Sequence, residues 1–427
     1  MGVRGRPTAI DLFAGAGGMS LGFEQAGFDV VAAVEVDPIH CAVHEYNFPD
    51  CSLICANVSQ LSGAEIFRQA GVTEVDVLFG GPPCQGFSLM GKRLLDDPRN
   101  ALVSDFIRLV GEIEPRYVVM ENVKGMATGK QRQVLAEAIA ALGAIGYGVV
   151  EPPQVLNAAH YGVPQYRERL FLLAYRLGET PPHYPTPMTY PAGKRPRKGK
   201  LAQLSPSPTV QEALQDLPQI EQYEALWEQD GVEANFGVPS QYGAILRGLA
   251  VDLGDYGYPR PWRPNWLSNS GRSRHRDSSI ERFRQTPPGE REPVSRFFRL
   301  PPQGICNTLR AGTPSSRGAF TSPRPIHPQH PRCITVREAA RLHSYPDWFR
   351  FHVTKWHGFR QIGNSVPPWL ARAVAESVRE SLGGEVEHPQ GEWPLGDEGL
   401  LSLTMTQAAA RYGVAADAIA PRRRLGE

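Results

Sequence analysis

One cysteine of the chain stands in a loop that could present it as a nucleophile. The loop runs Gly80-Gly81-Pro82-Pro83-Cys84-Gln85-Gly86-Phe87-Ser88 and follows an apolar segment, Val75–Phe79, that is expected to be a strand. Because ligands bind beyond the carboxyl ends of strands in open α/β sheets, Cys84 is expected in a crevice. Most free cysteines are buried and inert, but the flanking Pro-Pro and Gln-Gly pairs disfavour a buried strand position. A thiol that its site polarises could act there as a nucleophile.

Three charged side chains could assist a reaction at Cys84. Glu121 follows an expected strand, Tyr117–Met120, and so reaches the same sheet edge as the cysteine. A carboxyl group held there with a raised pKa could act as a general acid. Arg167 and Arg169 alternate in an expected strand and should point to one face. The alternatives are a carboxylate at a helix N-terminus for Glu121 and surface ion pairs for the arginines.

A glycine-rich turn indicates a nucleotide-type cofactor. Gly15-Ala16-Gly17-Gly18 lies between an expected strand, Thr8–Phe13, and a helix through Leu21–Ala26, and the next strand, Val30–Val34, ends at Glu35. Such glycines let the backbone approach a ligand, and the acid accepts hydrogen bonds from ribose hydroxyls. The third glycine of the dinucleotide fingerprint is missing, so the turn alone does not separate NAD from S-adenosyl-L-methionine.

The elements around these residues alternate between strand and helix. Further helices are expected at Leu102–Ile113 and Val134–Leu142, and helical periodicity returns at Val336–Leu342 and Trp369–Leu382. This alternation predicts an α/β fold with a mostly parallel, doubly wound sheet that is covered on both faces.

The middle of the chain differs in composition. After about residue 175 it becomes rich in proline, and a basic run, Lys194–Lys200, follows. From Arg260 to Arg341 there are sixteen arginines, five acidic residues and no lysine, although the net charge of the whole chain is only +1. Arginine suits bidentate contacts to phosphate or guanine, but a solvated basic surface would explain the composition as well. Scattered tryptophan and phenylalanine side chains favour a packed, loop-rich domain over disorder.

Six motifs in order resemble those of the cytosine-5 DNA methyltransferase family, prokaryotic type. They are Asp11-Leu12-Phe13-Ala14-Gly15-Ala16-Gly17-Gly18, Pro83-Cys84-Gln85, Glu121-Asn122-Val123, Gln165-x-Arg167-x-Arg169, Arg337-Glu338-Ala339-Ala340-Arg341-Leu342 and Gly363-Asn364-Ser365-Val366-Pro367. The resemblance implies a Rossmann-like methyltransferase domain that uses S-adenosyl-L-methionine, and a smaller, loop-rich target-recognition domain. It implies methylation of carbon 5 of cytosine in a specific sequence of double-stranded DNA.

Carbon 5 of cytosine is too weak a nucleophile to attack a methyl sulfonium group. Addition of the Cys84 thiolate at carbon 6 makes it an enamine carbon, which is strong enough. Glu121 would then donate to ring nitrogen 3, and the resemblance implies that Arg169 holds O2 while Arg167 supports the acid and the adduct. The target cytosine must first be flipped out of the duplex. The base that removes the carbon 5 proton is not identified by the sequence.

The resemblance also implies the binding residues. The cofactor-binding set is Phe13, Gly15, Gly17, Glu35, Asn57, Val58, Pro83, Leu102, Asn364 and Ser365. Asn57 stands where the family usually has aspartate, and its amide oxygen can still accept from the adenine amine. The DNA-binding set is Gln85, Ser88, Lys92, Arg93 and Arg310. The segment from Leu89 to about Arg99 is expected to be a mobile loop that closes over the flipped base.

We expect four parts. Residues 1–180 form the catalytic and cofactor-binding domain, 181–332 the target-recognition domain, 333–384 a C-terminal part that returns to the catalytic domain, and 385–427 a tail of unknown role. No signal peptide or membrane span is apparent, so we expect a cytoplasmic monomer, associated with the nucleoid when bound to DNA. A restriction-modification or phage-defence system is the expected setting.

The six cysteines show no disulfide framework. Zinc ligation by Cys41, His44, Cys51 and Cys55 is an alternative, but their spacing matches no common zinc pattern and no metal is expected. Three other functions are alternatives that experiment would distinguish. A tRNA cytosine-5 methyltransferase would be identified by its substrate, a silent DNA-binding protein by its lack of activity, and an NAD oxidoreductase by cofactor titration.

Overall fold

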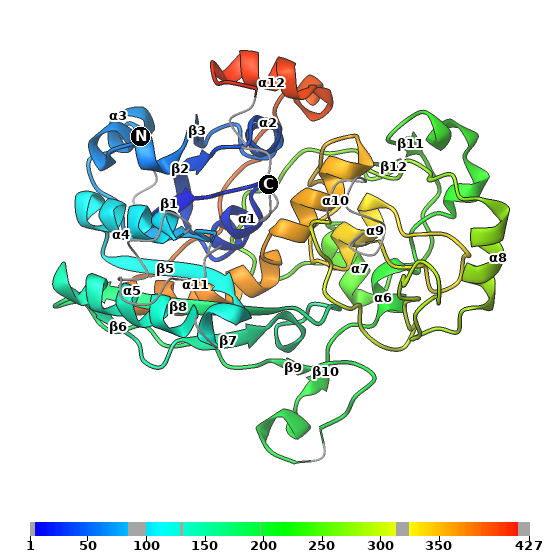
Figure 1. Cartoon of the computed structure of the whole chain (residues 1–427), viewed down its shortest axis with the longest axis horizontal. Coiled ribbons are helices and arrows are strands. Elements are labelled where there is room, and N and C mark those ends of the chain that lie inside the picture. Colours follow the sequence, from blue (N-terminus) through cyan, green and yellow to red (C-terminus); the bar gives the residue numbers. More distant parts are fainter. Residues whose placement is uncertain (1–4, 84–99, 129–130, 197, 313–323, 417–427) are drawn as a thin grey trace, which may run out of the picture.

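The computed structural model describes residues 5–83, 100–128, 131–196, 198–312 and 324–416. Figure 1 shows two lobes: one is built on a central sheet, and the other consists mainly of loops and short helices. Among the described residues, none of the helices combines the length and the apolar character needed to cross a membrane.

The central sheet has eight strands in the order β3-β2-β1-β4-β5-β8-β6, with β7 also paired to β8. Its strands are β1 (Thr8–Leu12), β2 (Asp29–Glu35), β3 (Ser52–Cys55), β4 (Val77–Gly80), β5 (Tyr117–Val123), β6 (Tyr147–Val149), β7 (Gln154–Asn157) and β8 (Glu168–Arg176). The first five pair in parallel, whereas β8 runs antiparallel to β5, β6 and β7. The prediction of a mostly parallel, doubly wound sheet is therefore confirmed.

Helices cover both faces of this sheet. The helices of both lobes, in the part of the chain that the structure describes, are α1 (Gly18–Gln25), α2 (Pro38–Asn47), α3 (Gly63–Ala70), α4 (Ala101–Ile113), α5 (Arg132–Ala144), α6 (Val210–Leu214), α7 (Gln241–Leu246), α8 (Asp277–Gln285), α9 (Val336–Arg341), α10 (Lys355–Asn364), α11 (Pro368–Leu382) and α12 (Met405–Tyr412). Apolar side chains of α3, α4 and α5 form the core on one face, and those of α1 and α11 form it on the other. The predicted helices and strands are all present, with ends shifted by up to three residues.

Short 3-10 turns and two small ribbons complete the fold. The turns are η1 (Val58–Gln60), η3 (Lys124–Ala127), η5 (Ala158–His160), η6 (Lys200–Gln203), η7 (Ile220–Gln222), η8 (Glu224–Trp227) and η11 (Glu398–Ser402). The ribbons pair β9 (Thr189–Tyr190) with β10 (Ser205–Pro206) and β11 (Val232–Glu233) with β12 (Trp266–Leu267).

A C-terminal helix returns to pack on the first helix of the chain. A Cβ atom added at Gly22 of α1 would lie 2.5 Å from the Ala371 side chain and 2.6 Å from the Pro368 carbonyl oxygen of α11. Only glycine permits this approach. Because α11 covers the sheet beside α1, the loop that precedes α11 lies close to the glycine turn that precedes α1.

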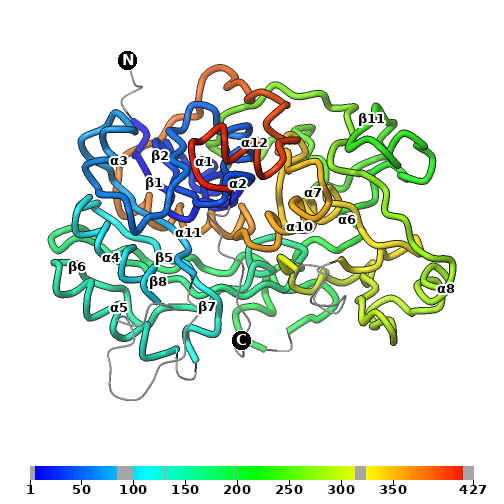
Figure 2. The backbone as a smooth tube through the Cα atoms, turned by 45° about the horizontal axis from the view of Figure 1, so that its top comes forward, coloured from blue at the N-terminus to red at the C-terminus, as the bar shows by residue number. Residues whose placement is uncertain are grey.

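The two lobes share a second apolar core. This core joins side chains of α1 and α2 to side chains of α6, α7, α9 and α10. Beyond α11 the chain continues along the same junction: the Trp393 ring stacks on Tyr258 with centroids 3.5 Å apart, and Tyr412 of α12 donates to Glu45 of α2 at 2.6 Å. Figure 2 shows α12 beside α2 from a second direction.

Candidate active site

An acid and an arginine meet at the edge of β5 and β8. Glu121 lies inside β5, which is longer than expected, and Arg169 lies in β8. Val123 is paired with Arg169 in the antiparallel register, so Glu121, two residues away on the same face, is its diagonal neighbour. Arg169 Nε lies 2.8 Å from Glu121 Oε1, and the two side chains are only 14% and 12% exposed.

The surroundings of Glu121 favour its protonated form. Burial raises the pKa of this carboxyl group, while the charges of Arg169 and Arg167 oppose the rise without cancelling it. A carboxyl group with a raised pKa holds its proton to higher pH than an ordinary glutamate, and the protonated form can donate a hydrogen bond or a proton to a substrate. The pair can therefore present an acid together with a fixed positive charge.

The start of the cysteine loop is held against this acid. A Cβ atom at Gly81 would lie 2.7 Å from Glu121 Oε2, so a larger residue there would displace the carboxylate. The Asn122 amide donates to the Pro82 carbonyl oxygen at 2.9 Å. Pro83, the last residue of this segment that is described, is exposed.

Several predicted residues cannot be placed. Cys84, Gln85, Ser88, Lys92 and Arg93, with the expected closing loop from Leu89 to Arg99, lie outside the described residues.

Arg167 has a different environment from Arg169. It immediately precedes β8 and is fully buried. Its guanidinium donates to the carbonyl oxygens of Leu309 at 2.6 Å, Gly363 at 2.8 Å and Ser365 at 2.7 Å. Burial, followed by repulsion from Arg169, lowers the pKa of Arg167 well below its ordinary value. The acid therefore has Arg169 as its ion-pair partner, whereas Arg167 ties together two distant loops.

A buried histidine that the sequence reasoning missed supports the same loops. The Gln165 amide NH2 group donates to His343 Nδ1 at 2.8 Å, and the Gln165 amide oxygen accepts from the Leu309 N–H at 3.0 Å. The ring proton must then lie on Nε2, which faces the Ser365 carbonyl oxygen at 3.2 Å. Burial, with repulsion from Arg167, lowers the pKa of His343 well below its ordinary value, so the ring is neutral. Its position directly after the Arg337–Leu342 motif was the available signal.

The glycine turn and Glu35 form a pocket edge suited to a ribose. Gly15 has a φ of +58°, and a Cβ atom there would meet nothing within 4 Å. Its N–H donates to Glu35 Oε2 at 2.8 Å, and the Asp37 N–H donates to Oε1 at 2.9 Å. Each carboxylate oxygen keeps a free lone pair, which is what two ribose hydroxyls require. The turn and Glu35 therefore fit the ribose of a nucleotide-type cofactor, as the sequence predicts.

The other cofactor candidates surround this edge. Phe13, at a φ of +66°, packs with Leu102 against the apolar core that contains Val58. Asn57 is exposed, and its amide oxygen caps η1 by accepting from the Ser59 N–H at 3.1 Å.

The motif at residues 363–367, near the C-terminus, packs against the glycine turn that precedes α1. A Cβ atom at Gly18 would lie 2.8 Å from the Ser365 Cβ atom and 2.6 Å from the Val366 carbonyl oxygen. Gly17 adopts a φ of +97° at the start of α1. Asn364 is exposed beside this contact. Residues from both ends of the chain thus meet at one site.

A second buried polar group lies behind the turn. Ser20 donates to Asp11 Oδ2 at 2.6 Å and lies 3.1 Å from His44 Nε2. Burial raises the pKa of Asp11 to about 8 and lowers that of His44 to about 3.

The described residues hold no group of three or more side chains that could bind a metal ion, and the five described cysteines are free.

Many arginines of the second lobe have structural partners. Arg341 is fully buried between Asp216 at 3.0 Å and Asp347 at 2.6 Å, and Arg260 is buried against Glu24 at 2.7 Å. The abundance of arginine therefore does not by itself mark a binding face. Arg310 differs: it is exposed, and its backbone touches Gly363 at the rim of the site.

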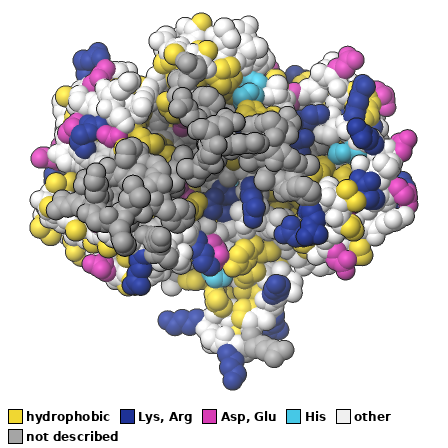
Figure 3. Space-filling model, viewed as in Figure 1, with side chains coloured by type: hydrophobic (Ala, Val, Ile, Leu, Met, Phe, Trp, Pro, Cys, Tyr) yellow, Lys and Arg dark blue, Asp and Glu magenta, His cyan; other side chains and the backbone are white. Residues whose placement is uncertain are grey.

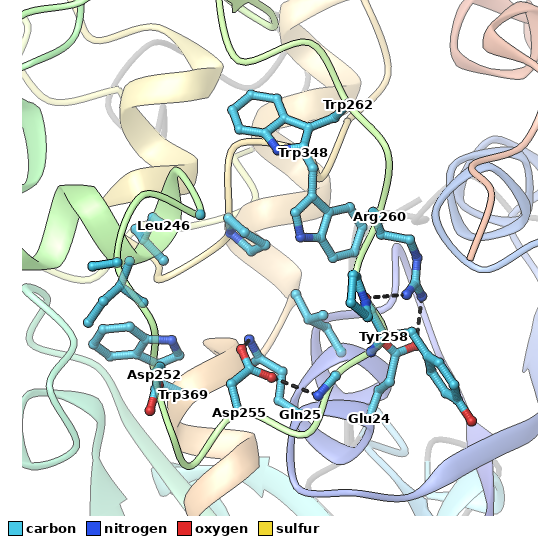
Figure 4. A pocket seen from close by; sticks show the side chains of 17 residues that line it. Glu24, Gln25, Leu246, Asp252, Asp255, Tyr258, Arg260, Trp262, Trp348 and Trp369 are labelled. Carbon is cyan, nitrogen blue, oxygen red and sulfur yellow. Dashed lines mark hydrogen bonds and ion pairs between the residues drawn. The ribbon is translucent and has the colours of Figure 1, made fainter. Parts of the chain in front are cut away.

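A cavity of about 300 Å³ lies elsewhere, between α1 and the segment 245–262. Figure 4 shows Trp262, Trp348 and Trp369 around it, with Asp252 and Asp255 at one end. None of the predicted site residues lines this cavity, so it is separate from the chemistry described above.

Known proteins are similar to this chain over most of its length. The family model of the C-5 cytosine-specific DNA methylases matches residues 8–380. The Type II methyltransferase M.XorII of Xanthomonas oryzae pv. oryzae is 54% identical over 98% of this chain and 95% of its own length. The Type II methyltransferase M1.HphI of Haemophilus parahaemolyticus is 32% identical over 87% and 86%. A solved structure described as a prophage-encoded DNA modification methyltransferase from E. coli matches with a TM-score of 0.70 and 34% identity, covering 88% of this chain and 99% of that one.

Proposed function

Because the chain belongs to the C-5 cytosine-specific DNA methylase family, we propose that it methylates a flipped-out cytosine within a specific duplex sequence through a covalent adduct. The enzyme is a cytosine-5 DNA methyltransferase. The finer steps, the residues that perform them and the biological setting are our proposal.

The cofactor of the proposal is S-adenosyl-L-methionine. When bound, it supplies an electrophilic methyl group on a sulfonium sulfur. Glu35 would accept from the ribose hydroxyls, Phe13 and Val58 would flank the adenine, and Gly15 would leave room for the chain of the methionine. Asn364 and Ser365, beside Gly18, would close the pocket, with Asn57, Gly17, Pro83 and Leu102 completing its wall.

The reaction begins with the cysteine. The Cys84 thiolate forms a bond to carbon 6 of cytosine, and the electrons of the 5,6 double bond make carbon 5 nucleophilic. Carbon 5 would then form a bond to the methyl carbon of the bound donor as the bond from that carbon to the sulfonium sulfur breaks, and a neutral thioether would leave. A base removes the proton from carbon 5, and the thiolate leaves as the double bond re-forms. Flipping the base out of the stack costs a few kcal/mol and is required for the thiolate to reach the ring.

Glu121 and Arg169 stabilise the charge that this addition creates. Electrons displaced by the thiolate accumulate on ring nitrogen 3, where the protonated Glu121 carboxyl group can donate. Arg169, which pairs with that carboxyl group at 2.8 Å, would interact with the O2 atom on the same edge of the ring. Arg167 positions the surrounding loops and does not pair with the acid. The contact between Gly81 and the Glu121 carboxylate is the observation that carries the proposal, because it joins the cysteine loop to the acid.

The target sequence would be recognised by the second lobe, which we assign to residues 181–332, inserted between catalytic parts 1–180 and 333–384. Arg310 would contact DNA at the rim, and Gln85, Ser88, Lys92 and Arg93 would act near the flipped base. Because M.XorII and M1.HphI are Type II methyltransferases, we place the enzyme in a restriction-modification or phage-defence system acting on DNA in the cytoplasm.

The covalent step can be tested by trapping. Bisulfite sequencing of DNA from cells that express the protein first identifies the methylated site. A duplex with 5-fluorocytosine at that site should then form a stable adduct with the wild-type protein in the presence of the methyl donor, since fluorine cannot leave as the proton does. Cys84→Ser should bind cofactor and DNA but form no adduct and turn over no substrate.

Cys51→Ser, which changes another cysteine in the turn before β3, is the matched control and should form the adduct normally. An active wild-type protein that gives no adduct would refute the covalent mechanism while leaving the methyltransferase assignment intact.

A further inference from the structure

A basic arm projects from the junction of the two lobes. We define the basic arm as residues 188–207, in which β9 and β10 pair in parallel at the base and η6 lies beyond the turn. Figure 1 shows that its turn extends away from both lobes. The described basic side chains of the turn, Lys194, Arg195, Lys198 and Lys200, are all exposed.

The charge of this arm is one-sided. Between residues 180 and 211 the sequence has five Lys or Arg residues and no Asp or Glu, although basic and acidic residues are nearly balanced in the whole chain, at 45 and 44. The flanking acids are already engaged: Glu179 pairs with Arg116 at 2.8 Å, and Glu212 caps α6 through Thr209. The arm therefore carries positive charge that its own neighbourhood does not neutralise.

The base of the arm is attached firmly to η5, the 3-10 turn that contacts Arg167 just before β8. Thr189 Oγ1 donates to the Ala159 carbonyl oxygen at 2.8 Å, and the Met188 N–H donates to the His160 carbonyl oxygen at 2.8 Å. Ala158 of the same 3-10 turn donates its N–H to the Arg167 carbonyl oxygen at 2.9 Å. The position of the arm is thus set relative to the catalytic groups.

The other lobe holds the base as well. The Ala192 N–H donates to Ser207 Oγ at 3.1 Å, which closes the ribbon. A Cβ atom at Gly193 would lie 3.3 Å from the Gly304 Cα atom, and the Val210 N–H donates to the Gly304 carbonyl oxygen at 2.8 Å. The arm therefore projects from a fixed base where the two lobes meet.

The face that carries the arm is basic. Figure 3 shows Lys and Arg side chains at the tip of the arm and again in the hollow between the lobes above it. The arm has three lysines and two arginines, and lysines contact phosphates as point charges, whereas the stretch from Arg260 to Arg341 has sixteen arginines and no lysine, and arginines suit bidentate recognition.

We propose that the basic arm binds the phosphate backbone of duplex DNA outside the recognised sequence. This inference rests on the proposed function, since it takes the enzyme to work on a duplex held between the lobes. The arm would add affinity and hold the enzyme in register on long DNA without recognising bases, because contacts to phosphate carry no sequence information. Each phosphate that a basic side chain neutralises releases a counterion, so the contribution depends strongly on salt.

The test compares two variants that lose the same charge. Lys194→Ala/Lys198→Ala removes two charges from the arm, and Arg68→Ala/Arg132→Ala removes two exposed charges from α3 and α5. Binding is measured over a series of salt concentrations on a long duplex with flanking DNA and on a short duplex that covers only the site. On the long duplex, the slope of log K against log salt should fall by about 2 for the arm variant, from about 0.9 per lost contact.

On the short duplex, the arm variant should bind and methylate like the wild-type protein, and the control should match the wild type on both duplexes. Equal slopes for the two variants on long DNA, or an equal loss of binding for the arm variant on short and long DNA, would overturn the inference. A wild-type protein that neither binds nor methylates any duplex would instead overturn the proposed function.

Discussion

Replacing Arg167 by lysine and replacing Arg169 by lysine should impair different properties of the enzyme. Arg167→Lys keeps a positive charge but replaces a planar group with five donors by a single ammonium. In the wild-type structure one guanidinium nitrogen serves Leu309, and the other serves Gly363 and Ser365. One ammonium cannot occupy both positions, so at least one buried carbonyl oxygen loses its donor.

The size of the effect follows from these contacts. A buried acceptor left without a partner costs about 1–3 kcal/mol, so Arg167→Lys should lower the melting temperature by several degrees. The loop of Gly363 and Ser365 also closes the glycine turn at Gly18. If about 1 kcal/mol of this loss falls on the cofactor site, affinity for S-adenosyl-L-methionine should fall about fivefold.

Arg169→Lys should behave in the opposite way. Arg169 has a largely buried ion pair with Glu121 and a hydrogen bond to the Glu168 carbonyl oxygen, and in the part of the chain that the structure describes it bonds no loop around the cofactor site. Lysine keeps the positive charge that pairs with Glu121. Stability should change by about 1 kcal/mol or less, and cofactor affinity should stay at the wild-type value. The turnover number should fall about 100-fold, as for loss of a preorganised electrostatic contact.

Three measurements on each variant separate the roles: thermal unfolding without ligand, cofactor titration, and turnover with saturating cofactor and DNA. The decisive comparison is cofactor affinity against turnover. If Arg167→Lys leaves unfolding and cofactor affinity unchanged, or if both variants lose the same functions in the same proportion, the assignment of Arg167 to the loops and of Arg169 to the acid is wrong.

The protonation of Glu121 and the buried charges of the second lobe give two more predictions. Burial raises the pKa of Glu121 and the charge of Arg169 lowers it, so turnover that needs the protonated acid should fall as pH rises through that pKa. Arg169→Gln removes the charge that lowers the pKa, so the descending limb should move to higher pH even as turnover falls. A limb that moves to lower pH in a turnover-pH profile would contradict this. Arg341→Met removes the shortest ion pairs of the buried Asp216 and Asp347 and leaves them only the longer pairs to Arg247 at 3.5 Å and Arg337 at 3.6 Å, so it should cost about 3 kcal/mol of unfolding free energy. An unchanged denaturation midpoint would refute that role.

The parts of the site that lie near each other in sequence were predictable. The turn at Gly15 and the acid at Glu35 end neighbouring parallel strands, so their proximity follows from the alternation of strand and helix. Glu121 was placed at the correct sheet edge by the same reasoning, although it belongs to β5 itself. These positions follow from the local pattern of strands and helices, which can be read directly from the sequence.

The contacts between distant segments were not predictable. The partners of Arg167 lie 142 to 198 residues further along the chain, and the role of His343 depends on the amide of Gln165, 178 residues away. Strand alternation predicted that Arg167 and Arg169 would share a face. The strand begins only at Glu168, so Arg167 lies outside the ladder and its side chain enters the interior instead.

The same distinction narrows the search for residues that recognise DNA. Arginine was abundant in the stretch from Arg260 to Arg341 for two reasons that composition cannot separate, since a guanidinium fork serves a buried carboxylate as well as it serves a base or phosphate. An arginine that is already paired could contact DNA only by leaving its carboxylate partner unpaired, and this costs free energy when the pair is buried. The arginines of this stretch that are exposed and form no ion pair with a described residue are Arg274, Arg276, Arg291, Arg296 and Arg310. Base recognition by described arginines of the second lobe should therefore come from this smaller set.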